Sequence, residues 1–589
     1  MAKKKKKKKK YRLKIGRVIL LLVILTILAL GTRLFLDGKA MYDQARNAKY
    51  ELGEIIDAVK AEDYDKAQER TEVVHGIIKS LREKLEGPIW SHCDLIPKYG
   101  PDFVTGCRLL DIADEMMDKY LTEGFELLKA YPLSTLKVEN TFNAAAGIHY
   151  LNFAEKVLPD AEAVVEEISH MHISLDKENL IGKYTVKIQD LFDLYHSAEK
   201  FVPFVKAMIG DGEDKLYLLA AQNSAEIRAG GGFPGSMGTI RIKDGYLSIG
   251  DFTSVWDVLS LVIPDEELVS YQEWYLFYAW MEYPRDASYD PYFPKVAYIW
   301  AESYEARMGE HIDGVISMSP IIIQKLLACT EPITLEDGTV LDGTNATKFI
   351  QNDIYMKYLN AEAIYWGMDE GDAISNALFS SIASQTMSKV FSSVNLDNIP
   401  KFMKMVEESI SDRILMMWLR DSDGQSAIRS IGATGEFNTD PEHPQLGVYF
   451  SNSNPSKLGW YLDMDINVGD PVVLDNGALR YNVSVSLYNT IDWGTVYYAG
   501  SYIAVETELG YFISYLHLVA PKGGYISGYW MDNWQWMEED EYMGNQIVFA
   551  RHFYIGPQEQ VVAYFEVTTA PGVTEPLEVV HTPTLQEYR

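Results

Sequence analysis

Hydrophobic and polar positions follow a helical spacing from residue 39 to about residue 206. Apolar residues recur every three or four positions, as in YELGEIIDAVKAEDYDKAQERTEVVHGIIKSLREKL, and charged residues fill the positions between them. This spacing puts the apolar side chains on one face of each helix. Pro88, Pro97, Pro132 and Pro159 divide the region. We therefore predict separate helices over residues 39–206 that form a stalk or pack against a partner.

Strand and helix patterns alternate over residues 207–435. Short apolar runs typical of strands occur in LYLLAAQ at 216–222 and DGVISMSP at 313–320, and FPKVAYIWAESYEARM at 293–308 has helical spacing. This alternation predicts an α/β domain in which a sheet lies between helices. Further helical patterns between residues 369 and 429 follow it.

Over residues 445–589 the pattern changes to alternating apolar and polar positions. Seven short segments show it, from GVYFSNS at 447–453 to QVVAYFEVTT at 560–569, with turn sequences such as Asp475-Asn476-Gly477 between them. Strands of this length and spacing predict a β-sandwich. Its aromatic segment at 529–536 is either core or a surface for a carbohydrate or protein partner.

The N-terminal residues predict a membrane anchor. Lys3–Lys10, with three further basic residues, precede the uncharged apolar run Val18–Thr32, which Leu34–Leu36 extends. We predict a cytoplasmic polybasic tail at 1–17 and a transmembrane signal anchor at 18–36. The positive-inside rule then puts the N-terminus in the cytoplasm and the bulk of the chain outside a cell membrane that it crosses once. The alternative is a cleaved signal peptide, because Ala29-Leu30-Gly31 offers small residues for cleavage.

The predicted fold class is thus multidomain α+β: an N-terminal transmembrane helix, a helical stalk, an α/β domain and a C-terminal β-sandwich. The chain has 53 basic and 84 acidic residues, and eleven of the basic ones precede Val18. The remainder therefore has a formal charge of −42. We expect no nucleic-acid partner for so acidic a body, and any lipid must be held in a specific pocket. Cys93 and Cys107 either form a disulfide or stay reduced, and both alternatives remain open.

Residues 223–238 combine an arginine with a glycine-rich loop. Gly230, Gly231 and Gly232 follow Arg228 between two predicted strands. A guanidinium beside backbone amides that turn inward suits a phosphate or another anion. The alternative is a tight turn that needs glycine for positive φ, with Arg228 paired to Glu226 or Asp251.

Two other segments of the α/β region carry candidate chemistry. Arg285 and Asp286 follow a Tyr-Pro pair, and Asp353 lies at the far end of a helix predicted to begin near Thr344. Asp286 and Asp353 are candidates to bind Mg²⁺ or to act as bases. The alternative for each is a solvated loop or helix end. The chain has no Walker A loop, no G-x-S-x-G elbow and no H-E-x-x-H motif.

Three segments resemble the bacterial family known as domain of unknown function 4012: QNSAEIRAGGGFPGS, DPYFPKVAYIWAESYEARMGEHIDGVISMSP and DGTVLDGTNATKFIQNDIYMKY. The order of Pro284-Arg285-Asp286, a helix, DGVI at 313–316, another helix and Leu341-Asp342-Gly343 is similar to the LytR-CpsA-Psr family. Members of that family are membrane-anchored and transfer glycan polymers from polyprenyl-diphosphate carriers to peptidoglycan. They use arginines on the diphosphate and acidic residues that hold Mg²⁺.

The second resemblance implies a LytR-CpsA-Psr-like domain in which Arg285 and Asp286 match the family's Arg-Asp pair. Phe349–Asp353 lacks the arginines of the corresponding family helix, and the hypothesis is that Arg228 supplies part of that charge. The implied function is handling of polyprenyl-phosphate-linked glycans and cell-wall polymer, with phosphotransfer as one form. Arg228, Arg285 and the three glycines would hold the diphosphate, and Asp286 and Asp353 would hold Mg²⁺. The alternative is a non-catalytic structural or adhesion protein that binds glycan or protein through its β-sandwich.

Overall fold

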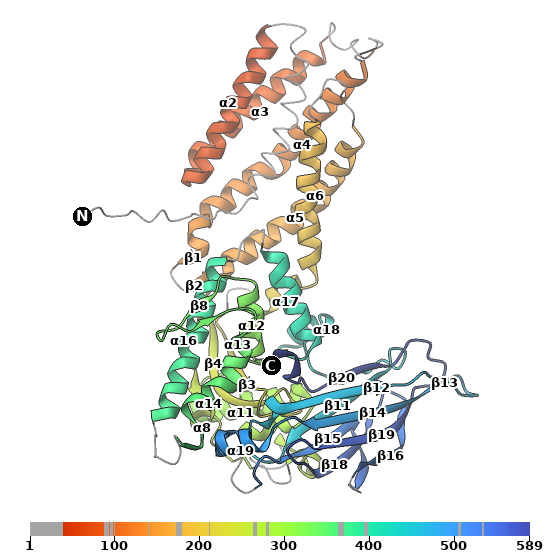
Figure 1. Ribbon diagram of the computed structural model, residues 1–589. Helices are drawn as coiled ribbons and strands as arrows, with labels where there is room; N and C mark the ends of the chain where they lie inside the picture. Colours follow the sequence, from red (N-terminus) through yellow and green to blue (C-terminus); the bar gives the residue numbers. More distant parts are fainter. Residues whose placement is uncertain are drawn as a thin grey trace.

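The computed structural model describes residues 39–589 with gaps at 88–93, 95–97, 99, 139–140, 172, 174–178, 211–212, 263–267, 279–281, 363–369, 394–397, 505–507 and 533–534. Long helices form an elongated bundle at one end of the molecule (Figure 1). They are α2 (Lys39–Ala61), α3 (Tyr64–Leu85), α4 (Gly100–Ala130), α5 (Ala144–Ser169) and α6 (Leu180–Glu199), followed by the shorter α7 (Val202–Ile209). Their apolar stripes face inward: Val74, Ile78 and Leu81 of α3 pack with Leu110 and Met117 of α4.

The predicted fold class needs one correction. It included an N-terminal transmembrane helix, but among the residues that the structure describes no helix combines the length and the apolar composition that crossing a membrane requires. The predicted span at 18–36 and the basic tail at 1–17 lie outside the described residues. Cys93 also lies outside them, so the choice between a disulfide and two thiols stays open.

An eight-stranded mixed sheet forms the centre of the α/β region. Its order is β1-β2-β5-β4-β3-β7-β10, with the short β6 (Thr253–Ser254) beside β4. The bounds are β1 Lys137–Val138, β2 Thr141–Asn143, β3 Lys215–Asn223, β4 Phe233–Lys243, β5 Tyr246–Ile249, β7 Gly314–Met318 and β10 Leu415–Leu419. Strands β3 and β7 run parallel, whereas β3–β4 and β7–β10 are antiparallel.

Side chains of β3 alternate between two cores. Leu216, Leu218 and Ala220 pack with α11 (Phe293–Met308), whereas Tyr217 and Leu219 pack with helices on the opposite face. Helices α12 (Ile321–Ala328), α17 (Ile399–Ser411) and α18 (Ser422–Ser430) contribute to the core on that opposite face. Helix α16 (Glu370–Ser393) packs against α12. Shorter helices include α8 (Val255–Val258), η5 (Pro284–Tyr289), α13 (Ala346–Lys348), the π-helix η6 (Phe349–Asp353) and α14 (Ile354–Tyr358). Because successive side chains of a strand point to opposite faces, β3 contributes to the cores on both faces of the sheet.

The C-terminal residues form two packed β-sheets. One has the order β17-β18-β15-β11-β20, and the other has the order β12-β14-β19-β16 with β13 beside β14. Their bounds are β11 Gln445–Asn452, β12 Leu462–Val468, β13 Val472–Val473, β14 Leu479–Asn489, β15 Phe512–Val519, β16 Tyr525–Met531, β17 Met537–Tyr542, β18 Asn545–Ile555, β19 Gln560–Thr568 and β20 Glu578–His581. Inward residues such as Phe450, Leu516, Val485 and Phe565 fill the space between the sheets.

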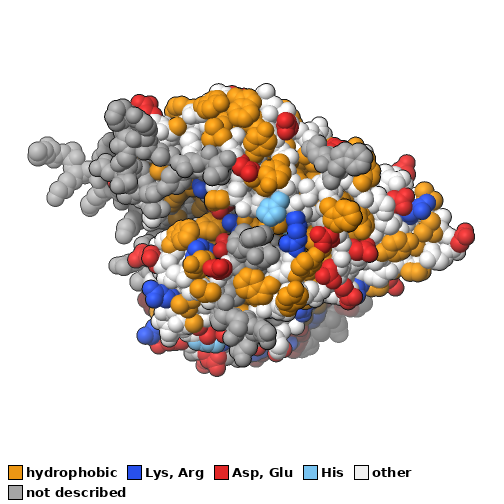
Figure 2. Space-filling model, turned by 90° about the horizontal axis from the view of Figure 1, so that it is seen from below, with side chains coloured by type: hydrophobic (Ala, Val, Ile, Leu, Met, Phe, Trp, Pro, Cys, Tyr) orange, Lys and Arg blue, Asp and Glu red, His pale blue; other side chains and the backbone are white. Residues whose placement is uncertain are grey.

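The sandwich packs directly on the α/β region. Tyr449, Tyr515 and Phe549 from the β11-containing sheet share one hydrophobic core with Val296 and Trp300 of α11. The β11-containing sheet is therefore covered on both sides. On the face seen from below in Figure 2, hydrophobic side chains are spread among acidic ones and a few basic ones. The loop between β3 and β4 lies at this junction, because the amide of Asn452 in the sandwich donates to the carbonyl of Ile227 over 2.9 Å.

Candidate functional site

The turn between β3 and β4 is fixed by short-range hydrogen bonds. The side chain of Asn223 accepts from the Ala225 amide over 3.0 Å, as expected of an asparagine turn. Gly231 and Gly232 have φ of +112° and +139°, so their backbone is accessible mainly to glycine. The amides of Gly230 and Gly231 donate to the carbonyls of Ser288 and Arg228 over 2.8 and 3.0 Å. These two glycine amides are thus used inside the protein, and the glycines let two backbones approach closely.

Arg228 is a buried guanidinium with unfilled hydrogen-bonding capacity. Its side chain is 5% exposed, and its guanidinium carbon lies 3.7 Å from the centre of the Tyr289 ring. Nη2 donates to Glu226 Oε1 over 3.3 Å, but Nε and Nη1 are buried without a hydrogen-bond partner among the described residues. Of the arginines that the structure describes, Arg228 is the one with two such nitrogens. Buried hydrogen-bond donors usually have an acceptor in the protein, so Nε and Nη1 of Arg228 are suited to donate to an acceptor on a ligand.

Asp286 faces Arg228 from η5. Its Oδ1 lies 3.8 Å from Nη1 of Arg228, which is too long for a hydrogen bond but close enough for strong charge interaction. Burial raises the pKa of Asp286, and the charges of Arg228 and Arg285 act against that increase. Desolvation disfavours the ionised carboxylate. A proton on Asp286 is therefore easier to keep than on a solvated aspartate.

Arg285 contacts two aromatic rings. Its guanidinium carbon is 4.0 Å from the centre of the Trp256 ring and 3.8 Å from that of Tyr283. The arginine is 8% exposed, whereas Trp256 on α8 is 60% exposed. Contact with the two rings helps to hold the guanidinium in place. Arg285 thus lies between the surface at Trp256 and its neighbour Asp286, which faces Arg228.

Asp353 has different partners. Its carboxylate oxygens lie 2.5 and 2.7 Å from Nζ of Lys348, and Asn352 also donates to it. Asp286 and Asp353, predicted to act together on Mg²⁺, are thus each engaged by their own basic residue. Within the described residues, the group of three clustered metal-type ligands is His75, Asp114 and Asp118 in the helical bundle. The donor set around Asp286 does not fit Mg²⁺, which needs several oxygens around one point.

Lys457 is a residue of the site that was not predicted from the sequence. It comes from the segment between β11 and β12, and its Nζ lies 3.7 Å from Glu226 Oε2 and 4.8 Å from the centre of the Tyr355 ring. The sequence pattern that could have indicated Lys457 is its place after a buried strand and the turn sequence Asn454-Pro455-Ser456. With Lys457, the cluster has three cations against Glu226 and Asp286, so its charge is net positive when all are ionised.

Comparison with known proteins gives one match. Residues 212–355 match the family model described as "Protein of unknown function (DUF4012)". The predicted relationship to this family is confirmed over that segment, which contains Arg228, Arg285, Asp286 and Asp353. The resemblance to the LytR-CpsA-Psr family stays a prediction. No curated protein matches the chain, and no solved structure matches it.

Proposed function

We propose that this protein binds a polyprenyl-phosphate-linked glycan through its phosphate, with Arg228 and Arg285 as the phosphate ligands. The observation that supports the proposal is the unfilled hydrogen-bonding capacity of the buried Arg228 guanidinium. A phosphate oxygen would accept a charge-assisted hydrogen bond from Nε or from Nη1. In this proposal the acidic body of the protein works in the cell envelope, outside the cytoplasm.

The neighbouring carboxylates are compatible with an anion. Lys457 lies beside Glu226 and offsets part of its charge. Asp286 lies 3.8 Å from Nη1 of Arg228, and burial raises its pKa. A protonated Asp286 would donate a hydrogen bond to phosphate instead of repelling it. Phosphate binding and proton uptake by Asp286 would therefore be coupled.

The different partners of the two candidate acids favour binding over phosphoryl transfer. Transfer reactions of this type depend on metal ions or several cations that stabilise the transferring group. Asp353 pairs with Lys348 and Asn352, whereas Asp286 lies beside Arg228. We therefore assign Asp286 a role in phosphate recognition and leave glycan transfer outside the proposed function.

Binding can be measured by ³¹P NMR with farnesyl phosphate as a short-chain probe. We expect a shifted or broadened resonance with the wild-type protein, which added inorganic pyrophosphate reverses. Arg228→Gln should weaken binding by at least about tenfold, because a hydrogen bond to a charged group contributes about 1.5–3 kcal/mol. Arg228→Lys should show an intermediate loss, since the charge stays but the planar fork is lost.

Arg413→Gln is the matched control. Arg413 is also buried, at 7% exposure, but its Nη2 donates to the carbonyl of Pro291 over 2.9 Å. This variant should bind farnesyl phosphate like the wild type. The proposal is wrong if the wild-type protein leaves the ³¹P resonance unchanged, or if Arg228→Gln and Arg413→Gln have equal affinity for the probe.

A further inference from the structure

The β12-containing sheet has an outward face that no described element of the chain covers with a hydrophobic core. Its outward residues lie in cross-strand rows. One row joins Asp463, Tyr488 and Gln560 on β12, β14 and β19, the next joins Asp465, Ser486 and Val562, and the third joins Asn467, Ser484, Tyr564 and Trp530. We call these ten residues the outer face. Across four strands, and along the five residues from 463 to 467 on β12, it extends about 14 Å by 13 Å.

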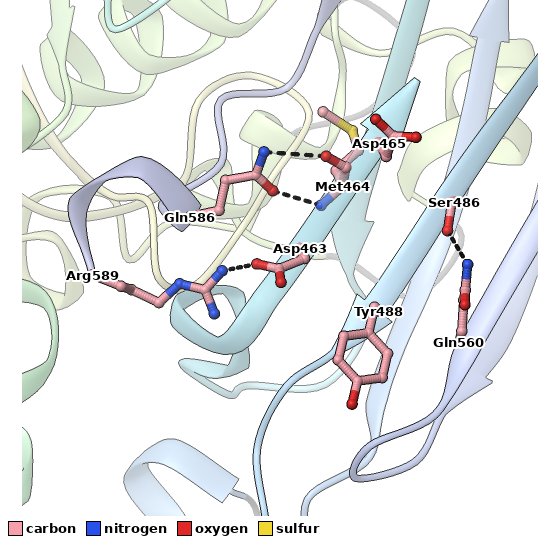
Figure 3. A pocket seen from close by; sticks show the side chains of 8 residues that line it. All are labelled: Asp463, Met464, Asp465, Ser486, Tyr488, Gln560, Gln586 and Arg589. Atoms are coloured by element: carbon pink, nitrogen blue, oxygen red, sulfur yellow. Dashed lines mark hydrogen bonds and ion pairs between the residues drawn. The ribbon is translucent and has the colours of Figure 1, made fainter. Parts of the chain in front are cut away.

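A depression of about 770 Å³ lies over the first two rows. Figure 3 shows its lining side chains on β12, β14, β19, the C-terminal helix η9 (Gln586–Tyr588) and Arg589, which follows η9. The Gln586 side chain accepts from the Met464 amide over 2.7 Å and donates to the Met464 carbonyl over 3.1 Å. Ion pairing of Arg589 with Asp463 closes the same end. These contacts fix one wall of the depression.

Several polar groups in the depression are available to a ligand. Gln560 donates to Ser486, which orients both side chains side by side on the sheet. The Asp465 carboxylate and the Tyr488 hydroxyl have no hydrogen-bond partner among the residues that the structure describes. The depression thus offers the Asp465 carboxylate as an acceptor, the Tyr488 hydroxyl, and the paired Ser486 hydroxyl and Gln560 amide, all within two neighbouring rows.

The third row adds an aromatic platform. The rings of Trp530 and Tyr564 stack with their centres 4.6 Å apart and an angle of 22° between their planes. They remain 53% and 40% exposed. Stacked rings of this size usually bury their area in a core, so exposure on a sheet face indicates a binding surface. The sequence left open whether the aromatic segment is core, and the structure places Trp530 on the surface.

We propose that the outer face binds an uncharged oligosaccharide. A sugar ring has apolar C–H faces that stack on Tyr564, Trp530 and Tyr488, and hydroxyls that pair with the side chains of Asp465 and Gln560. Such a mixture of aromatic surface and a few convergent polar groups is typical of small-molecule sites. The free carboxylate of Asp465 disfavours phosphorylated or uronic-acid sugars and nucleic acid. This site is separate from the Arg228 cluster and does not depend on the proposed phosphate binding.

The test is calorimetric titration of the full chain with hexasaccharides of glucose, N-acetylglucosamine, xylose and mannose, at millimolar concentration. At least one should bind. Tyr564→Ala should weaken that binding by about tenfold or more, and Asp465→Asn should also weaken it. Tyr554→Ala is the matched control, because Tyr554 lies on β18 of the other sheet and is 48% exposed.

Two results would overturn this inference: no hexasaccharide binds, or Tyr564→Ala and Tyr554→Ala bind equally well. Both substitutions remove an exposed side chain, so circular dichroism should show unchanged folding for each. Arg228→Gln should keep wild-type affinity for the hexasaccharide. Loss of saccharide binding in Arg228→Gln but not in Tyr564→Ala would assign the saccharide to the Arg228 cluster and contradict the outer face.

Discussion

Asp290 couples proton binding to the junction between the α/β region and the sandwich. Its carboxylate is fully buried at the end of η5, accepts from the Tyr542 hydroxyl over 2.6 Å and accepts from the Tyr292 amide over 2.8 Å. Burial raises the pKa of Asp290 to about 7, although both hydrogen bonds act against the increase. We predict that Asp290→Asn changes the pH dependence of stability at this junction.

The sign follows from linkage. Because the folded state holds the Asp290 proton more tightly than the unfolded state, its stabilising contribution is complete below pH 4 and is lost as the pH rises to about 7. The difference from the ordinary value corresponds to an upper limit of about 4 kcal/mol. The asparagine side chain of the variant is neutral at every pH and keeps an acceptor for the Tyr292 amide. Relative to the wild type, the variant should therefore gain stability between pH 4 and pH 8.

The assay is hydrogen exchange of residues 284–292 in both proteins across that pH range, corrected for the intrinsic exchange rate. A local measurement is needed because a chain with several cores does not unfold in one step. His517 contributes an opposite slope, but its effect is common to both proteins and largely cancels in the comparison. A stability difference between Asp290→Asn and the wild type that stays constant from pH 4 to pH 8 would refute the reasoning.

Three further predictions concern backbone strain, helix propensity and pH. Gly232→Ala should lower the local stability of the β3–β4 turn by about 2 kcal/mol or more, since φ is +139° and a Cβ would lie 2.6 Å from the Asn223 carbonyl oxygen. Gly309→Ala, with φ of +74° and open space, should lower local stability by only about 1 kcal/mol. Equal losses of hydrogen-exchange protection around the two glycines would contradict this. Gly76 is exposed and lies in the middle of α3, so Gly76→Ala should stabilise the helical bundle by about 1 kcal/mol. Slower hydrogen exchange of α3 in the variant would support this prediction, and faster exchange would contradict it. Burial lowers the pKa of His517 to about 3, so local stability should fall as the pH falls below about 6.5. His517→Gln should flatten that decline, measured by hydrogen exchange of residues 512–519, and an unchanged decline would count against the prediction.

Local patterns predicted much of the secondary structure. The runs at 216–222 and 313–320 correspond to β3 and β7, and the helical spacing at 293–308 corresponds to α11. These elements repeat a simple period over several residues, which is the strongest signal in a single sequence. The π-helix at 349–353 was not anticipated, because a wider helical turn leaves no distinct hydrophobic period.

Only part of the candidate site could be predicted from the sequence. Arg228 could be paired with Glu226 because the two residues are neighbours in the chain. Its burial depends on Tyr289 and on the sandwich, whose contacts with the loop come from residues more than 200 positions later. The role of Lys457 was missed for the same reason. The alternative interpretation of the loop, a turn that needs glycine for positive φ, holds at 231 and 232. The partner of the Gly230 amide lies in η5 and could not be predicted from the loop sequence.

The most direct test of phosphate binding at Arg228 is lipid analysis of the full chain purified from its own cells. Native mass spectrometry followed by lipid extraction should find a polyprenyl phosphate bound to the wild-type protein. Arg228→Ala and Arg285→Ala should lose most of it, and Arg413→Gln should retain it. Absence of any polyprenyl phosphate from the wild-type protein, or wild-type levels in Arg228→Ala, would contradict the account.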